Sequence, residues 1–599
     1  MAAREALRGG GEIWFMCAGI AGIGAAGYGN QYTNKLRKEL GNDCFERFYS
    51  HQSVALPAIL QYKVCEFQCE KLPAMLPRLF PKPSDDEYAA RLQVLHEKWA
   101  PLVFSKFMEL GGFYYKTGQK MAANQGGFSP PHYVDLFQPF LNAIPARSMR
   151  DVKHVIEDDF GAKLDTVFAS FDADPVGCAS IGQAHRATLR RSGERVIVKV
   201  QNPEAERTFR GDVLSLKMLV DAFMPQIAPA FDEIQKQFAT EFDYRGEAAN
   251  SVEIRGNLLR EGFRNVVVPR VHVDLCTRRV LVMEEIYPSV PLHTALDRQA
   301  ELMAKRKGVS KAEFVEACAV EVRESTAAAA KRGDRAAQRS VSSTRYAFYI
   351  RLAKLKAAAY RAPLHVYDAT LGPWRGRYSA AAEAAPINAA RLVDDLFAVH
   401  GHQILIDGCF NADPHPGNIL HLEDKIALID YGQVKRLTDD ERLRLATMYY
   451  LCAHALRGDP RALPGADAAA HARAKACVSR HMRETLGVET KRGDDDVLYD
   501  MCCVYFGRSD AAWLHPRNLL QFSDACEASD PLVSIAKCEF VIMTHSTSLL
   551  LRGLAEILQQ PRSLGDVWGP LARRTLREAG RLDAVDAEIA AWTQRPSAP

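Results

Sequence analysis

The sequence lacks the short motifs of several common enzyme classes. It contains no G-x-x-x-x-G-K-[ST] phosphate loop, no H-E-x-x-H zinc motif and no G-x-S-x-G nucleophile motif. Its 14 cysteines form no C-x-x-C pairs, so we expect reduced structural thiols rather than a zinc site or a disulfide framework. A net charge of +3 is too small to indicate nucleic acid as the main ligand.

What the chain does have is enough apolar sequence for more than one core. With 599 residues, of which 47% are hydrophobic, two or more compact units are expected. The stretch "GCFNADPHPGNIL", residues 408–420, places Asp413 five residues before Asn418. Pro414 and Pro416 fix φ and predict a stiff, irregular loop. This loop either aims a carboxylate and a carboxamide at a metal–phosphate group or is only a proline-rich turn.

The residues that follow favour the first alternative. Two short apolar runs, 419–422 and 426–429, are separated by a turn-like Glu-Asp-Lys and predict a β-hairpin. Asp430 then ends the second strand and is followed by an aromatic residue and a glycine. Protein kinases have the same order of loop Asp, loop Asn and Asp-aromatic-Gly, in which the last two bind magnesium.

A kinase also needs a lysine on a strand and a glutamate partner for it. "GERVIVKVQNP" predicts a strand with alternating valines and with Lys199 on the other face, although a lysine on an exposed sheet face is a common alternative. "EFDYRGEAAN" supplies three acids, Glu241, Asp243 and Glu247. They fit a solvated helix face or, for Glu247, the partner of Lys199.

The glycine-rich loop of ordinary protein kinases is absent. In place of G-x-G-x-x-G before Lys199 stands "DPVGCASIGQAHRATL", with Ala179 and Ser180 at the expected turn. Alanine keeps the backbone farther from phosphates than glycine does, so a differently shaped nucleotide roof is expected.

These motifs together resemble the UbiB/AarF/ADCK atypical kinases, which are associated with ubiquinone and other isoprenoid-quinone lipids. The resemblance covers roughly residues 95–300 and 390–460. It rests on "KTGQ" at 116–119 with "LNAIP" at 141–145, and on "CASIGQAH", "VIVKVQNP", "EFDYRGEAAN", "RVLVMEEI", "NADPHPGNIL" and "IDYG" in the family's order.

The resemblance implies a role for each motif residue. It implies that Asn418 and Asp430 bind Mg²⁺ and that Asp413 occupies the catalytic-loop position. Lys116 and Gln119, which are implied to be catalytic together with Asp413, belong to a helical extension that excludes peptide substrates. The residues implied to bind or surround the ATP/ADP nucleotide, or to hold that extension near it, are Lys199, Glu247, Ala179, Ser180, Glu241, Asp243 and Glu284.

Two positions depart from the family's pattern. Asn411 stands where the family usually has histidine; its neutral amide can hydrogen-bond the loop but cannot titrate near neutral pH. Tyr431 replaces the phenylalanine of D-F-G but keeps an aromatic ring.

The resemblance implies an α+β, bilobal protein-kinase-like fold with helical extensions at both ends. We expect an N-terminal targeting or anchor and helical region at 1–94, the K-x-G-Q helical extension at 95–175 and the N-lobe at 176–290. The C-lobe is expected to start at 291–324 and to continue with the catalytic region at 386–460 and a helical C-terminal extension at 461–599.

The remaining segment, 325–385, contains 18 alanines and has 11 Lys or Arg against 3 Asp or Glu. We expect it to be disordered or partly helical. It is either a solvated insertion, a contact for an anionic lipid surface, or an intervening segment retained by error.

The N-terminus carries an apolar stretch at residues 13–29 with basic residues on both sides. A signal peptide, a short membrane anchor and a buried helix all fit this stretch. Arginines with little acid at the very start of the chain, together with the link to quinones, favour a mitochondrion, with a plastid as the alternative.

The function expected from the sequence is Mg-dependent ATP hydrolysis or phosphoryl transfer in isoprenoid-lipid metabolism. The expected partners are a nucleotide and an isoprenoid lipid or membrane surface, without nucleic acid. The alternatives are a pseudokinase scaffold that binds nucleotide or lipid, and a phosphotransferase of the aminoglycoside or choline kinase type.

Overall fold

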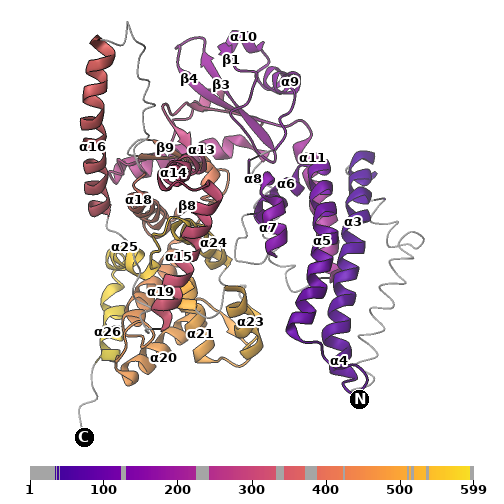
Figure 1. Cartoon of the computed structure of the whole chain (residues 1–599), viewed down its shortest axis with the longest axis vertical. Helices are drawn as coiled ribbons and strands as arrows, with labels where there is room; N and C mark the ends of the chain where they lie inside the picture. The colour runs from indigo at the N-terminus through magenta and orange to yellow at the C-terminus, as the bar shows by residue number, and fades with distance from the viewer. Residues whose placement is uncertain are drawn as a thin grey trace. The chain divides into compact units, whose positions relative to one another are not determined.

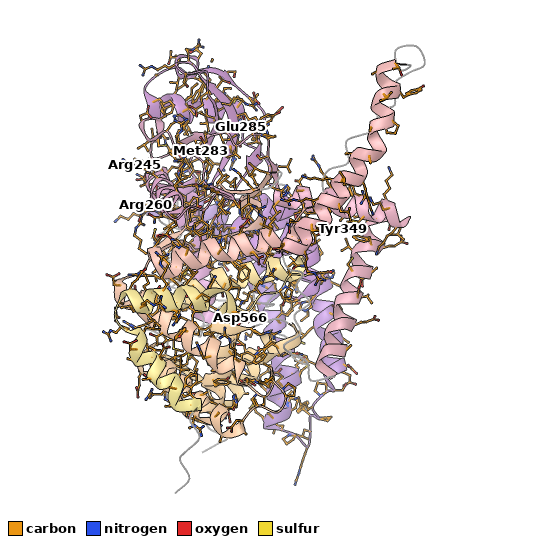
Figure 2. The ribbon with its side chains drawn as sticks, turned by 90° about the vertical axis from the view of Figure 1, so that its left-hand side faces the viewer. Arg245, Arg260, Met283, Glu285, Tyr349 and Asp566 are labelled. Carbon is orange, nitrogen blue, oxygen red and sulfur yellow. The ribbon has the colours of Figure 1, made fainter. Side chains whose placement is uncertain are left out.

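The chain divides into two compact units in a computed structural model. The first contains Met1–Arg245 and His272–Met283, and the second contains Gly246–Val271 and Glu284–Pro599 (Figure 1). Figure 2 labels Arg245 and Met283, where the chain leaves the first unit. The structure describes residues 34, 37–38, 41–122, 130–142, 144–223, 242–331, 343–370, 387–422, 425–508, 511–514, 519–534 and 539–593.

Helices form much of the first unit. The long helices α3 and α5 pack against each other, and α11 packs on α3. A capping box of Ser84 and Glu87 starts α5. Gly111 and Gly112, both with positive φ, end α5 and separate it from α6. The bounds are α3 Asn42–Glu66, η1 Phe67–Lys71, α4 Leu72–Met75, α5 Asp85–Leu110, α6 Phe113–Ala122, α7 Pro131–Phe137, α8 Pro139–Asn142, α9 Met149–Phe160, α10 Leu164–Val167 and α11 Ala205–Phe223.

The first unit also contains a sheet in the order β1-β3-β4-β6, with β2 paired to β3. The central pair β3 and β4 is antiparallel. Val196, Val198 and Val200 of β4 are buried in one apolar core with helix α9, as their alternation predicts. The bounds are β1 Phe168–Phe171, β2 Gly177–Cys178, β3 Gly182–Leu189, β4 Arg195–Gln201 and β6 Val280–Glu284.

The second unit combines small sheets with a large helical core. Its main sheet has the order β5-β10-β9-β7, and β8 pairs with β11 and β12 with β13. The predicted hairpin is confirmed as β9 and β10, whose antiparallel register pairs Leu422 with Lys425 and Ile419 with Leu428. The bounds are β5 Val266–Val267, β7 Val290–Pro291, β8 Cys409–Asn411, β9 Ile419–Leu422, β10 Lys425–Leu428, β11 Val434–Arg436, β12 Glu489–Thr490 and β13 Leu532–Ser534.

Helix α19 packs against α25 at the centre of the helical core. A capping box of Thr438 and Glu441 starts α19. The bounds are α13 Tyr244–Arg260, η4 Val273–Leu275, α14 Leu292–Lys307, α15 Lys311–Lys331, α16 Ser343–Thr370, α18 Ala389–His402, η5 Gln403–Asp407, η6 Pro416–Asn418, α19 Asp439–Arg457, α20 Ala468–Glu484, α21 Asp495–Cys502, η7 Cys503–Gly507, α22 Ala511–Leu514, α23 Leu519–Ser529, α24 Glu539–Ile557, α25 Leu564–Glu578 and α26 Leu582–Thr593.

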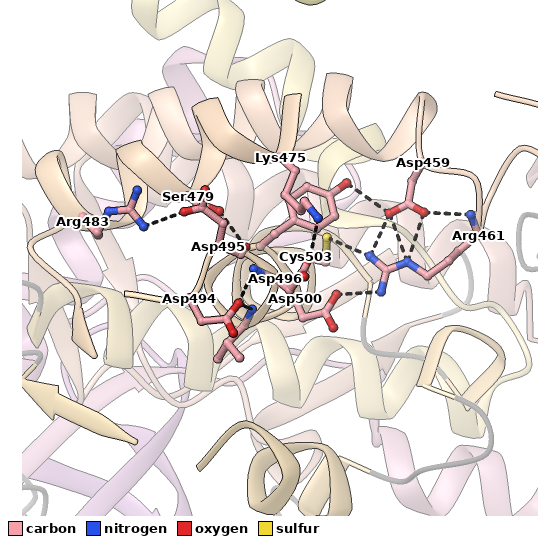
Figure 3. A network of polar contacts seen from close by, with 12 residues as sticks. Asp459, Arg461, Lys475, Ser479, Arg483, Asp494, Asp495, Asp496, Asp500 and Cys503 are labelled. Atoms are coloured by element: carbon pink, nitrogen blue, oxygen red, sulfur yellow. Dashed lines mark hydrogen bonds and ion pairs between the residues drawn. The ribbon is translucent and has the colours of Figure 1, made fainter. Parts of the chain in front are cut away.

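Polar contacts fix α20 on α21 (Figure 3). Arg483 binds Asp495 at 2.7 Å, and the Ser479 hydroxyl donates to the Asp495 carbonyl at 2.9 Å. Lys475, one turn before Ser479 on α20, pairs with Asp496 of α21. Three side chains spaced at four-residue intervals thus hold one face of α20.

Two sequence expectations concern the ends and the insertion. Within 325–385, the described residues are helical in α15 and α16, which fits the partly helical alternative. The stretch 13–29 lies outside the described residues. Among the helices that the structure describes, none is both long and apolar enough to span a membrane.

Candidate functional site

The loop that carries Asp413 lies between β8 and β9 in the second unit. A π-helical turn, η5, ends at Gly408 with φ +65°, and β8 follows directly. Such π-turns inside helices often occur at functional sites. The loop closes on itself, because the His415 amide donates to the Asp413 carbonyl at 2.7 Å and the Asn418 amide donates to the His415 carbonyl at 2.9 Å.

Asn411 holds this loop to the Asp-Tyr-Gly segment. Its side-chain oxygen accepts from the amide of Asp413 at 2.9 Å, and its side-chain nitrogen donates to the carbonyl of Asp430 at 2.9 Å. Asn411 is buried, and its own amide donates to the Gln403 side chain at 3.2 Å. The residue that departs from the family's pattern therefore has a bridging role that needs no titration.

The hairpin brings the two residues expected to bind metal to neighbouring backbone positions. The amide of Ile429 donates to the carbonyl of Asn418 at 3.1 Å, and Asp430 is the next residue along the chain. The Asp430 carboxylate accepts from the amide of Gly432 at 3.0 Å. Backbone pairing between β9 and β10 thus sets the position of both residues.

Glu247, on α13, faces the same glycine as Asp430. A Cβ atom added to Gly432 would lie 3.4 Å from the Asp430 carboxylate and 3.5 Å from the Glu247 carboxylate. Asn250, one turn further along α13, donates to the carbonyl of Tyr431 at 3.1 Å and fastens the helix to this segment. Glu247 is 4% exposed and Asp430 is half-buried, so a buried and a half-buried carboxylate both face Gly432.

The oxygen atoms of this site suit a hard divalent cation. Carboxylate and amide oxygens are the ligands that Mg²⁺ prefers, and Asp430 and Asn418 offer one of each. The nearby Glu247 carboxylate adds negative charge, which a bound cation would offset. The residues present therefore fit the metal that the resemblance implies.

Lys199 lies on β4 in the first unit. It pairs in register with Ala184 of β3, and its Nζ lies 5.1 Å from the centre of the Tyr244 ring. This is within the range of a cation–π interaction. The predicted strand position of Lys199 is confirmed, and its pairing with Glu247 stays a prediction.

The alanine-rich loop of the first unit is a tight turn between β2 and β3. The amide of Ala179 donates to the carbonyl of Gly182 at 2.7 Å, and Ser180 is buried. Only glycine fits at position 182, because a Cβ there would lie 2.5 Å from the Val200 carbonyl. The turn is therefore fixed by its own backbone, and the Ala179 amide is already engaged.

Lys116 and Gln119 lie on α6, as the K-x-G-Q resemblance implies. Between them, Gly118 packs so closely on Phe140 that a Cβ would approach the ring to 2.6 Å. The glycine of K-T-G-Q is thus required by the contact between α6 and α8.

The remaining residues implied by the resemblance are Asp243, Glu284 and Glu241, which lie outside α6 and α8 in the sequence. Asp243 binds Arg245 at 2.6 Å, and Glu284 lies 3.7 Å from Arg270. Glu241 lies outside the described residues. The role of the two acids in holding the extension, and that of Glu284 beside a nucleotide, stay predictions.

The sequence reasoning missed a buried ion pair beneath α6. Arg47 of α3 binds both carboxylate oxygens of Asp212 of α11, at 3.0 and 2.6 Å. Arg47 also donates to the Leu110 carbonyl at the end of α5, at 2.6 Å. The Asp212 carboxylate accepts a hydrogen bond from the amide of Phe113, the first residue of α6. No sequence signal could have joined residues 165 positions apart.

The comparisons with known proteins agree with this geometry. The profile of the ABC1 atypical kinase-like domain matches residues 140–326 and 377–459. AarF domain-containing protein kinase 1 of Mus musculus is 33% identical over 205 residues, which is 33% of this chain and 38% of that protein. A protein of Vibrio cholerae named "Probable protein kinase UbiB" is 33% identical over 187 residues, 30% of this chain and 34% of that protein.

A third relative is an AarF domain-containing protein kinase of Arabidopsis thaliana whose name marks it as chloroplastic. It is 31% identical over 205 residues, 33% of this chain and 29% of that protein. The matches span less than half the length of each of these relatives. They confirm the expected resemblance and its kinase-like fold: this chain contains an ABC1 atypical kinase-like domain and is similar to proteins named AarF domain-containing protein kinase and UbiB.

Proposed function

We propose that this protein binds Mg-ATP and hydrolyses it or transfers its phosphoryl group. The main support is the bridge made by Asn411, which ties the loop of Asp413 to Asp430. This bridge keeps the loop of Asp413 beside the segment of Asp430, which is the arrangement that a metal–phosphate site requires. The match to the ABC1 atypical kinase-like domain agrees with this proposal.

In this proposal, Asn418 and Asp430 hold the Mg²⁺ ion. The ion supplies positive charge that neutralises the phosphates of the nucleotide. Phosphoryl transfer needs mainly positioning and electrostatic stabilisation from the protein. The hairpin provides positioning, because its hydrogen bonds set Asn418 and Asp430 at adjacent backbone positions.

Asp413 has the role of orienting the attacking hydroxyl or water and accepting its proton. Lys199 pairs with the phosphates, and Lys116 and Gln119 belong to the extension that limits access by peptides. Ala179 and Ser180 form the roof over the nucleotide. The fixed turn at Ala179 favours a roof that changes little when nucleotide binds.

The physiological role we propose is in isoprenoid-quinone metabolism in an organelle. The name UbiB among the relatives supports a role in isoprenoid-quinone metabolism. The name of one relative marks it as chloroplastic, which agrees with an organelle. We propose a mitochondrion, with a plastid as the alternative, and an isoprenoid lipid as the partner.

The test is ATP loss by the purified full chain with Mg²⁺, compared with Asp413→Asn. We expect loss of ADP formation in this variant, with a Tm close to that of the unaltered chain. Asp583→Asn is the matched control, because Asp583 is exposed on α26 of the second unit and is not among the residues proposed for the site. Equal turnover in Asp413→Asn would contradict the role of Asp413, and nucleotide binding without turnover in the unaltered chain would indicate a scaffold.

A further inference from the structure

Helix α16 is a part of this chain that the family profile does not match. The profile covers residues 140–326 and 377–459, and α16 is Ser343–Thr370 between them. Its side chains include several large apolar groups that are open to solvent. Phe348 is 71% exposed, Leu355 is 68% exposed and Val366 is 63% exposed. Figure 2 labels Tyr349 on this helix, which is 58% exposed.

The exposed apolar residues recur at helical spacing. Since a helix turns by about 100° per residue, those before Pro363, which lies inside the helix, fall within an arc of about 80° along a length of about 21 Å. The set is Phe348, Leu352, Leu355, Ala359, Ala362 and Val366, all of them exposed. Ile350 is buried and lies on the opposite side, so the helix already has one face packed on the protein. We call the exposed set the outer face of α16.

Basic residues flank the outer face on both sides. Arg345 and Lys356 fall about 60–80° to one side of it, and Arg351 about 60° to the other. All three are exposed. Residues 343–370 contain five Lys or Arg and one Asp. An apolar strip bordered by cations is typical of helices that lie in the interface of an anionic membrane.

We propose that the outer face of α16 lies on an anionic lipid surface. The apolar side chains enter the boundary between headgroups and acyl chains, and the flanking cations contact the headgroups. A protein partner would have to cover the same strip and supply acids on both sides. A bilayer with anionic headgroups meets both demands along the whole helix. The proposal rests on α16 alone and does not depend on the kinase site.

The test is co-sedimentation of the purified full chain with phosphatidylcholine vesicles that contain or lack phosphatidylserine. We expect binding to the anionic vesicles that weakens as salt is added. Phe348→Ser with Leu355→Ser should abolish it, and Arg351→Glu with Lys356→Glu should weaken it by more than about tenfold. Ile557→Ser with Leu463→Ser is the matched control, because both residues are exposed and apolar elsewhere in the second unit.

A second measurement locates the contact. In Phe348→Trp, acyl-chain-brominated lipids should quench the new tryptophan fluorescence above the level in the unaltered chain. Sedimentation of Phe348→Ser with Leu355→Ser equal to that of the control would overturn the proposal, and so would the absence of quenching. Self-association in light scattering that this double variant abolishes, without vesicle binding by the unaltered chain, would assign the outer face to a second copy instead.

Discussion

Single residues set the local geometry of the site through contacts that exclude other side chains. Asn411 is the clearest case, since one carboxamide both accepts from the Asp413 amide and donates to the Asp430 carbonyl. Neither function needs a charge, so the replacement of histidine leaves the bridge intact. Gly118 and Gly182 contribute by lacking a side chain, because each allows a close approach of a neighbouring group that a Cβ would prevent.

Replacing Asn411 by alanine should leave the Asp413 amide and the Asp430 carbonyl without this partner. We expect the free energy of unfolding of the second unit to fall by about 1–3 kcal/mol, the usual cost of unsatisfied buried polar groups. Urea unfolding of the purified chain measures this. A change below about 0.5 kcal/mol, the level of a neutral surface substitution, would show that the bridge contributes little to the stability of the second unit.

Two glycine substitutions should act with opposite sign. Gly118→Ala places a Cβ 2.6 Å from the Phe140 ring and should destabilise the first unit by about 1–3 kcal/mol. Gly256 of α13 has nothing within 4 Å of its added Cβ, so Gly256→Ala should stabilise the helix by about 0.4–1 kcal/mol. Tm values of the two variants against the unaltered chain give the signs. Two changes of the same sign would contradict the packing described here.

At the scale of elements, the Arg47–Asp212 pair connects four helices of the first unit. The pair itself joins α3 and α11. Arg47 also donates to a carbonyl at the end of α5, and Asp212 accepts from the first amide of α6, the helix that carries Lys116 and Gln119. Burial raises the pKa of Asp212 to about 6, against the opposing effect of Arg47 and the Phe113 amide. The position of α6 therefore depends on a buried charge whose partner is a single arginine.

Arg47→Met should destabilise these helices by about 3–5 kcal/mol at pH 7.5, because a buried carboxylate loses its partner. The folded-state pKa of Asp212 lies above its unfolded value, so the folded protein binds the extra proton and this group's contribution to stability rises as the pH falls through about 6. The destabilisation should shrink at pH 5.5.

Hydrogen exchange of peptides from α3, α5, α6 and α11 measures these effects at both pH values. Arg207→Met is the control, because Arg207 pairs with Asp43 and Glu204 at the surface. A destabilisation in Arg47→Met that is the same at both pH values would contradict the role of the Asp212 charge.

Helix α26 is fixed to α20 by a cluster around one carboxylate. Glu588 accepts from His481 at 2.9 Å, from Cys477 at 3.1 Å and from Arg480 at 2.6 Å, all on the same oxygen. These ligand types could hold a metal ion. The guanidinium of Arg480, however, already supplies a cation there. The cluster is therefore a hydrogen-bonded link between two helices.

Glu588→Ala should lower the free energy of unfolding of α26 by about 1 kcal/mol, since three donors lose their acceptor at a partly exposed position. Added Zn²⁺ should leave the Tm of the unaltered chain unchanged. Exchange rates of α26 peptides and the Tm with and without Zn²⁺ test both statements. A Tm increase with Zn²⁺ that Cys477→Ser abolishes would reverse the assignment.

Local patterns in the sequence predicted the elements that depend on neighbouring residues. The hairpin at 419–428 and the valine alternation of β4 follow from spacing alone, and both are present. The contacts of Asn411, Gly118 and Arg47 could not be predicted, since they depend on residues distant in the chain. The helices in 325–385 were only partly predicted, because an alanine-rich, basic segment fits both a helix and an unfolded chain.

At the scale of the whole molecule, the residues expected to act on a nucleotide come from both units. Lys199, Lys116 and the turn at Ala179 belong to the first, and Glu247, Asp413, Asn418 and Asp430 belong to the second. The proposal that they serve one reaction therefore predicts that a nucleotide binds only when residues of each unit are intact. Lys199→Met and Asp430→Asn should both abolish nucleotide binding although they lie in different units.

The most direct test is the Tm of the full chain with Mg-ATP, beside Asp430→Asn. A ligand at a hundredfold excess over its Kd stabilises the folded state by about 2.7 kcal/mol. We expect an increase in Tm that needs Mg²⁺ and is absent in Asp430→Asn, with unchanged Tm of that variant without ligand. An equal increase in both proteins would contradict the metal role of Asp430, and no increase with Mg-ATP or Mg-ADP in the folded, unaltered chain would contradict the nucleotide site itself.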